Sequence, residues 1–162
     1  KPAFAAGGVV TAGNSSQTSD GAAFVIVMGE KMMNELGLKP IGRLVNSAVA
    51  GVHPRIMGIG PVAAIPKVLK QAGMNLSQID LIELNEAFAV VGIENSKRMK
   101  LDPSKVNVHG GAVSLGHPLG CSGARIIVTL INVLKANKAK YGAAGICNGG
   151  GGASAMVIEN ME

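Results

Sequence analysis

The sequence predicts an α/β domain built around a mixed sheet, and three observations carry this prediction. Short apolar runs alternate along the chain with segments whose apolar residues recur every three or four positions. Clusters of Gly, Asn, Ser and Asp separate these segments, as is typical of turns. The last two apolar runs are joined only by residues 148–152, and a connection this short requires antiparallel strands.

Each element is expected where its own pattern begins and ends. Residues 1–21 carry the turn residues of a loop and lead into one domain over residues 22–162. Short apolar runs predict strands at residues 22–28, 41–52, 81–84, 106–109, 142–147 and 153–159. Helical spacing predicts helices at residues 30–36, 60–72, 86–99 and 124–136. Gly37 is the expected C-cap of the first helix, and Pro61 suits the first turn of the second.

Composition narrows the class of function. The net charge of +5 favours an anionic ligand, but three Phe, one Tyr and no Trp leave few stacking platforms for nucleic acid. Every apolar stretch is interrupted before the roughly 18 residues that a membrane span needs. We therefore expect neither a nucleic acid nor a membrane as partner.

The cysteines and the N-terminus suggest where the protein works. Cys121 and Cys147 lack the paired spacing of a disulfide framework, which favours a reducing compartment, either the cytosol or an organelle matrix. Of these we expect a cytoplasmic location. The chain does not begin with Met and shows no signal-peptide pattern. We expect it to be a piece of a longer protein.

The densest chemical signal is the segment Gly110–Arg125, which surrounds His117 with glycines and with Pro118. Glycines let main chain approach a ligand closely, and Pro118 restricts the backbone of the histidine before it. The apolar spacing after Gly123 is helical, so the loop opens a helix whose free N–H groups lie near His117. We interpret the segment as an active-site loop; the alternative is a hydrogen-bonded structural histidine.

Two further candidates stand at the ends of expected strands. Asn85 can hold a water or donate to an oxygen, or it can cap the following helix. Cys147 precedes glycines whose backbone can offer N–H groups to an oxyanion, and its alternative is a buried, inert thiol. Ser122 lacks the spacing of a nucleophile elbow and is expected to cap the helix after it.

Two other patterns suggest cofactor sites but are incomplete. Residues 58–63 fit G-x-G-x-x-A, yet Pro61 removes an N–H that would face a pyrophosphate. No close ligand pair of the usual zinc type occurs among His109, His117, Cys121 and Cys147. Neither a dinucleotide nor a metal is expected.

Five segments together closely resemble the C-terminal half of the thiolases. They are TAGNSS, AVAGVHPRIMGIGP, NEAFA, GGAVSLGHPLGCSGAR and CNGGGG, and in this order they extend over essentially the whole chain. The resemblance implies a thiolase-like fold, with a mixed five-stranded sheet and helices on both faces. It also implies an acyl-CoA C-acyltransferase of fatty acid and lipid metabolism, which condenses two acyl-CoA molecules or cleaves a 3-ketoacyl-CoA.

The resemblance gives each matching residue an expected role. His117 would activate the nucleophilic cysteine and bind the thioester oxygen, and Cys147 would remove or return the α-proton of the second acyl-CoA. Asn85 would position a water that forms one oxyanion hole with His117, and the N–H of Gly149 would contribute to another. Met57 would line the acyl pocket. The coenzyme A path would be lined by Phe4, Ala12, Ser16, Ala87 and Phe88.

The resemblance also defines what this chain lacks. Thiolases carry their nucleophilic cysteine in an N-terminal half, and neither Cys121 nor Cys147 matches its motif. The implied partners are therefore acyl-CoA substrates, an N-terminal thiolase domain and, in the complete enzyme, further copies in a homodimer or homotetramer. No cofactor is implied beyond coenzyme A thioesters as substrates. Departures from the family pattern at His53, Gly152 and Ala153 affect the expected shape of the acyl pocket.

Two rival functions stay open at this point. One is a non-catalytic acyl-CoA binding module, and the other is a structural subunit of a multienzyme complex. His117, Asn85 and Cys147 together count against a pure binder, since binding alone needs none of them.

Overall fold

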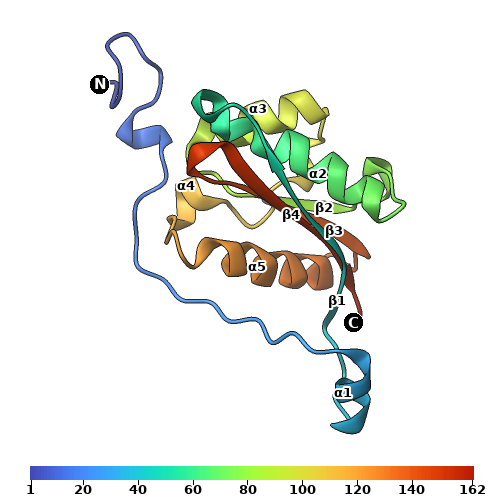
Figure 1. The fold of residues 1–162 in the computed structure, drawn as a ribbon. Coiled ribbons are helices and arrows are strands. Elements are labelled where there is room, and N and C mark those ends of the chain that lie inside the picture. Colours follow the sequence, from blue (N-terminus) through green and yellow to red (C-terminus); the bar gives the residue numbers. More distant parts are fainter.

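A computed structural model describes residues 1–162, and its centre is a single mixed sheet of four strands in the order β1-β4-β3-β2 (Figure 1). The strands are β1 (Gly42–Gly51), β2 (Leu81–Leu84), β3 (Tyr141–Cys147) and β4 (Gly152–Asn160). β2 and β3 are parallel, whereas β4 runs antiparallel to both β3 and β1. The expected mixed sheet with an antiparallel last strand is confirmed.

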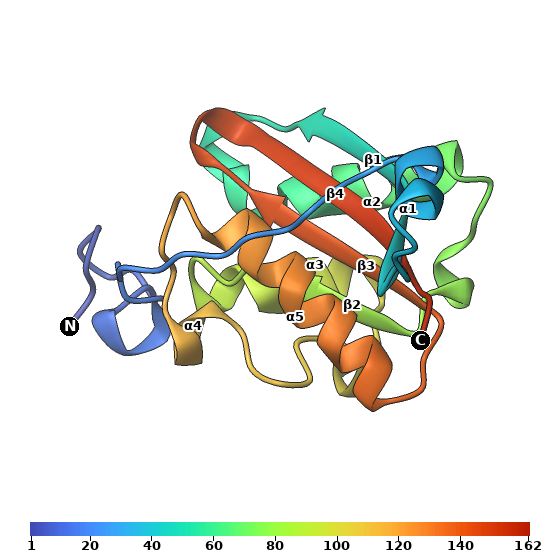
Figure 2. The same cartoon turned by 90° about the horizontal axis from the view of Figure 1, so that it is seen from below.

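Helices cover both faces of this sheet, as expected (Figures 1 and 2). α2 (Gly60–Gln71) and α3 (Ala89–Met99) lie on one side, and α5 (Ser122–Ala136) lies on the other. Two short helices, α1 (Glu30–Glu35) and α4 (Ala112–Leu115), lie outside these layers. The remaining elements are short 3-10 segments: η1 (Ala12–Asn14), η2 (Pro54–Ile59), η3 (Leu76–Gln78), η4 (Pro103–Lys105) and η5 (Gly149–Gly151). No helix is long and apolar enough to span a bilayer.

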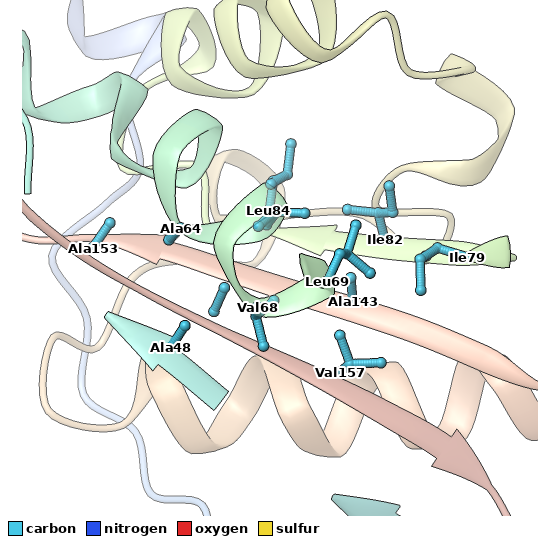
Figure 3. Packing of buried hydrophobic residues seen from close by; sticks show 12 residues of the cluster. Ala48, Ala64, Val68, Leu69, Ile79, Ile82, Leu84, Ala143, Ala153 and Val157 are labelled. Carbon is cyan, nitrogen blue, oxygen red and sulfur yellow. The ribbon is translucent and has the colours of Figure 1, made fainter. Parts of the chain in front are cut away.

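The core has two halves because side chains alternate along β2. Ile82 and Leu84 pack beneath α2, against residues such as Val68 (Figure 3). Leu81 packs on the other face with the apolar stripe of α5, which consists of Ile126, Leu130, Val133 and Leu134. The same alternation turns Glu83 toward α5. Asn85 is the first residue after β2, so the burial of this short strand fixes the position of Asn85.

Residues 106–109 do not form the strand expected there. Val106 makes a single parallel bridge to Ile82, and the chain then turns at Asn107, whose φ is +48°. The resemblance implied five strands, and the sheet has four. The edge of β2 is instead completed by one side chain, because the Asn107 amide bonds both backbone groups of Leu84.

Residues 22–28 are also not the buried strand that their apolar composition predicts. They run extended past α5 without pairing to any strand, and Phe24 is 88% exposed (Figure 2). An apolar run of this kind needs a neighbouring strand before it can join a sheet, and the chain provides none beside it. α1 begins directly after this segment.

Candidate active site

Asn85 and Cys147 lie at the same end of the sheet, because β2 and β3 are parallel and their carboxyl ends lie side by side there. Leu84 pairs with Gly145, and the Asn85 N–H donates to the Gly145 carbonyl at 3.0 Å. Cys147 is the last residue of β3, two positions further along. Asn85 does not cap α3, whose N-cap is Phe88.

His117 reaches this end of the sheet from the glycine-rich loop between α4 and α5. Gly116 has a φ of +92°, and a Cβ there would overlap the Ser19 hydroxyl, so only glycine suits the position before His117. The His117 N–H donates to the Gln17 carbonyl at 2.8 Å. The N-terminal segment therefore holds the histidine loop from outside.

The imidazole of His117 lies between two polar side chains. Nε2 is 3.3 Å from Asn85 Nδ2, and Nδ1 is 2.6 Å from Ser122 Oγ. Ser122 Oγ also lies 3.1 Å from the carbonyl of Pro118, to which it donates. All these contacts are satisfied when Asn85 donates to Nε2 and the Nδ1–H donates to Ser122. This arrangement leaves Nε2 without a proton of its own.

Burial and a neighbouring positive charge disfavour the protonated form of this imidazole. Desolvation lowers the pKa of His117 below its ordinary value, and the positive charge of Arg125 lowers it further. The ring is therefore neutral near pH 7. A neutral imidazole can take a proton from a thiol and can afterwards donate it to an oxygen.

Cys147 is 6% exposed, and burial raises the pKa of its thiol, an effect that a backbone hydrogen bond partly opposes. The first residue of α2 packs directly on it. A Cβ on Gly60 would lie 3.6 Å from that of Cys147 and 2.6 Å from that of Ala153. Only glycine allows the N-terminus of α2 to come this close to the thiol.

Gly149 follows Cys147 by two positions, in η5. A Cβ placed there would meet no heavy atom within 4 Å, so the backbone of Gly149 faces open space beside the thiol-bearing strand. η2, which carries Met57, packs against η5. The structure thus brings the segments of Cys147, Gly149 and Met57 together. No hydrogen bond joins Cys147 to His117 or Asn85.

Four of the five residues expected along the coenzyme A path form one cluster. The Phe4 and Phe88 rings meet edge to face, with centroids 5.7 Å apart. Ser16 donates to the Ala87 carbonyl through its hydroxyl at 2.8 Å and through its N–H at 3.1 Å. Ala12 lies in η1, in the same N-terminal segment, and is exposed.

Sequence reasoning missed several residues of this site. Ser122 is not the N-cap of α5, which is Cys121, and its hydroxyl instead bonds the imidazole. The carboxyl oxygens of Glu83 and the guanidinium nitrogens of Arg125 are buried, and none of them has a hydrogen-bond partner. Burial raises the pKa of Glu83 to about 7, although Arg125 opposes this. The available signal was position: Glu83 is two residues before Asn85 in a strand, and Arg125 is three after Ser122 in a helix.

No group of three or more His, Cys, Asp or Glu side chains lies close enough together to hold a metal ion. The G-x-G-x-x-A pattern at residues 58–63 is divided between η2 and the first turn of α2.

The fold is that of the thiolase class of α/β proteins, and comparison with known proteins bears this out. The model of the thiolase C-terminal domain matches residues 38–160, and that of the thiolase N-terminal domain matches residues 1–31. The chain belongs to the thiolase family.

The similar proteins are acetyl-CoA acetyltransferases and thiolases. The chain is 59% identical over 157 residues to acetyl-CoA acetyltransferase 1 of Arabidopsis thaliana, covering 96% of this chain and 38% of that protein. It is 52% identical over 162 residues to the cytosolic acetyl-CoA acetyltransferase ERG10 of Gibberella zeae, covering 100% and 41%. The chain thus spans about two fifths of the length of these relatives.

Solved structures give the same family. The acetyl-CoA acetyltransferase of Bacillus anthracis superposes with a TM-score of 0.96 at 49% identity, covering 99% of this chain and 41% of that one. Human mitochondrial 3-ketoacyl-CoA thiolase superposes with a TM-score of 0.92 at 43% identity and the same coverage, and it has also been solved in complex with CoA.

Proposed function

We propose that this chain is the C-terminal part of an acyl-CoA C-acyltransferase that condenses two acyl-CoA molecules or cleaves a 3-ketoacyl-CoA. The observation that carries the proposal is the placement of a neutral imidazole between Asn85 and Ser122, at the end of the sheet where Cys147 also lies. Relatives named acetyl-CoA acetyltransferase support the same chemistry.

In the first half-reaction His117 activates a nucleophilic cysteine supplied by an N-terminal thiolase domain. The thiol takes the place of the Asn85 amide at Nε2, and its proton passes to that nitrogen. The sulfur attacks the thioester carbonyl, and the bond from that carbon to the CoA sulfur then breaks. Before that bond breaks, the Nε2–H donates to the oxyanion of the tetrahedral intermediate, together with a water held by Asn85. Asn85 Oδ1 is buried and has no partner in the chain, so it is free to accept from such a water.

Cys147 moves the other protons. Because burial raises the pKa of its thiol, it begins protonated and gives its proton to the departing CoA thiolate. The resulting Cys147 thiolate removes the α-proton of the second acyl-CoA, with the enolate oxygen stabilised by the Gly149 N–H. The enolate carbon attacks the acyl-enzyme, and the released nucleophile recovers its proton from His117. Each group ends in its starting state.

The remaining site residues bind substrate. We assign the pantetheine path to the cluster of Phe4, Ser16, Ala87 and Phe88, with Ala12 beside it, and the acyl pocket to Met57. Coenzyme A thioesters are the substrates, and the proposed steps use no other cofactor and no metal. The chain acts in the cytoplasm, as the name of the Gibberella zeae relative suggests for that protein.

An N-terminal thiolase domain is the partner that the proposal requires. The exposed apolar segment 22–28 supports this, because it offers unpaired backbone groups and side chains such as Phe24 and Ile26 to a second sheet. Residues 1–31 match the N-terminal family model, which agrees with such an attachment. We further propose that the complete enzyme is a homodimer or homotetramer.

Thiolysis assays test the proposal. The purified 162-residue chain should not cleave acetoacetyl-CoA, and the chain joined to an N-terminal thiolase domain should cleave it; comparison with a longer 3-ketoacyl-CoA gives the chain-length preference. Turnover by the chain alone would make Cys121 or Cys147 the nucleophile. CoA binding without turnover by the joined protein would instead favour a non-catalytic binding module.

A further inference from the structure

Glu86 makes two contacts that join the parts of the candidate site. Its Oε1 accepts from Asn107 Nδ2 at 2.9 Å, and its Oε2 accepts from the Val113 N–H at 3.2 Å. Glu86 is the residue after Asn85, whereas Val113 lies in α4, the short helix that ends one residue before Gly116 and His117. One carboxylate therefore connects the segment of Asn85 with the segment of His117.

Asn107 binds the last residue of β2, Leu84, on the side of the strand that faces away from β3. Its Oδ1 accepts from the Leu84 N–H at 2.8 Å, and its Nδ2 donates to the Leu84 carbonyl at 2.9 Å. The Asn107 N–H donates to the Ile82 carbonyl at 2.9 Å. The side-chain amide thus satisfies the edge of β2 as a neighbouring peptide group would. Asn85 is fixed on both sides, at Leu84 and at Glu86.

Glu86 is half-buried, and its carboxyl group is crowded on the side of Gly111. A Cβ on Gly111 would overlap the Glu86 carboxyl group and would come within 2.7 Å of Asn107 Nδ2. The carboxylate therefore occupies a place that only glycine leaves open at the start of α4. A carboxylate that accepts charge-assisted bonds in a confined space holds its partners more firmly than a solvated one.

We propose that Glu86, oriented by Asn107, is a positioning residue that sets the separation of Asn85 and His117. It touches neither the imidazole nor the place of the thioester, and it acts through the strand end on one side and through α4 on the other. The catalytic part of this inference rests on the proposed acyl transfer, but the geometric part does not.

Glu86→Gln tests the inference in the complete enzyme that contains this chain. Glutamine keeps the size of the side chain but offers one carbonyl oxygen to two donors, so either the Asn107 or the Val113 contact is lost. We expect kcat for acyl transfer to fall on the order of tenfold to a hundredfold, because small displacements of catalytic groups have effects of this size. KM should change by less than about twofold, since substrate contacts are intact.

Two comparisons separate positioning from general damage. Glu94→Gln removes a carboxylate on α3 that accepts from Arg98, and it should leave kcat unchanged. In an Asn85→Ala background, Glu86→Gln should lower kcat by less than about a further twofold, because the side chain that Glu86 positions is already absent. Equal fold losses with and without Asn85 would overturn the inference.

A structural measurement keeps the test independent of activity. In a crystal structure of Glu86→Gln, the Asn85 Nδ2 to His117 Nε2 distance should exceed the 3.3 Å seen here and leave hydrogen-bonding range. An unchanged distance would refute positioning even if the protein proved not to be a thiolase. If Glu86→Gln does not fold, Asn107→Asp serves instead, because it keeps the acceptor for Leu84 and places a carboxylate against Glu86. It should lengthen the same distance and lower kcat similarly, and failure to do either would equally overturn the inference.

Discussion

Ser122 Oγ lies 2.6 Å from Nδ1 of His117, across the turn that opens α5. The hydroxyl donates its own proton to the Pro118 carbonyl, so it receives the ring proton rather than supplying one. The consequence is a fixed tautomer. Nε2, which points toward Asn85, is left as the acceptor that thiol activation needs.

Ser122→Ala should therefore slow acylation of the nucleophile in the complete enzyme by roughly tenfold to a hundredfold, the range known for hydrogen-bond partners that orient metal-bound histidines. The measurement is the rate of acyl-enzyme formation from acetyl-CoA. Ser122→Thr keeps the hydroxyl and should restore most of the rate. A full rate in the alanine variant would show that Ser122 does not select the tautomer.

His117→Ala should lower acyl-enzyme formation on the order of a hundredfold or more, since it removes both the proton acceptor and one oxyanion donor. Alkylation of the nucleophile by iodoacetamide should slow as well, because less thiolate is formed. His109→Ala is the matched control, as His109 is exposed in the segment leading to the same loop. If acylation is unchanged without His117, the imidazole is only a structural residue of the turn.

Cys147→Ala distinguishes proton transfer from acyl attachment. Exchange of the acetyl-CoA methyl protons with solvent deuterium should fall roughly a hundredfold to ten-thousandfold, as is common when a general base is removed. Burst acylation of the nucleophile should fall much less, because the CoA thiolate is a good leaving group and can take its proton from water when Cys147 is absent. Both rates are measured on one variant, so a loss of folded protein affects them equally.

The control for this experiment is Cys121→Ala, which removes the other buried free thiol. It should leave the ratio of exchange to acylation unchanged. Equal losses of both rates in Cys147→Ala would return that residue to the interpretation of an inert buried thiol.

Local patterns were sufficient for the elements that form the core. The strands ending at Leu84 and Cys147 and the helix starting at Gly60 were predicted to within one residue or matched. Their apolar residues are buried on the face that their spacing predicts, and burial of a periodic pattern is a local property. Asn85 and Cys147 were found for the same reason, because both stand at the ends of such strands.

Contacts between distant segments could not be predicted in this way. Asn107 is 23 residues from Leu84, yet its side chain replaces the strand that the apolar residues 106–109 suggested. The contact of Asn85 with His117 spans 32 residues, and nothing in either segment alone reveals it. The error at residues 22–28 has a different cause: apolar composition predicts the need for a neighbour but not the neighbour's presence.

The last prediction concerns Glu83, whose side chain is buried on the face of β2 that α5 covers. Burial raises its pKa from the ordinary 4.5 to about 7, and the opposing effect of Arg125 is smaller. No salt bridge joins the two side chains, so the carboxylate is poorly compensated. Between these two pH values the folded chain binds more protons than the unfolded chain.

The free energy of unfolding should therefore be highest below about pH 4.5 as far as this group is concerned, and should fall as the pH rises to 7. The loss amounts to about 3 kcal/mol in all. Glu83→Gln mimics the protonated carboxyl group. It should match the wild type near pH 5, exceed it in stability at pH 8, and flatten the slope between these values in urea denaturation.

Glu159→Gln is the matched control, because Glu159 is a buried carboxylate on β4 that pairs with Arg43 and Lys140 at the opposite end of the sheet. Removing its charge should change the free energy of unfolding by less than about 1 kcal/mol, since Arg43 and Lys140 are mostly exposed and water replaces the lost carboxylate, while the slope due to Glu83 persists. A Glu83→Gln variant less stable than the wild type at pH 8 would show that the charged form of Glu83 is stabilised by Arg125 after all.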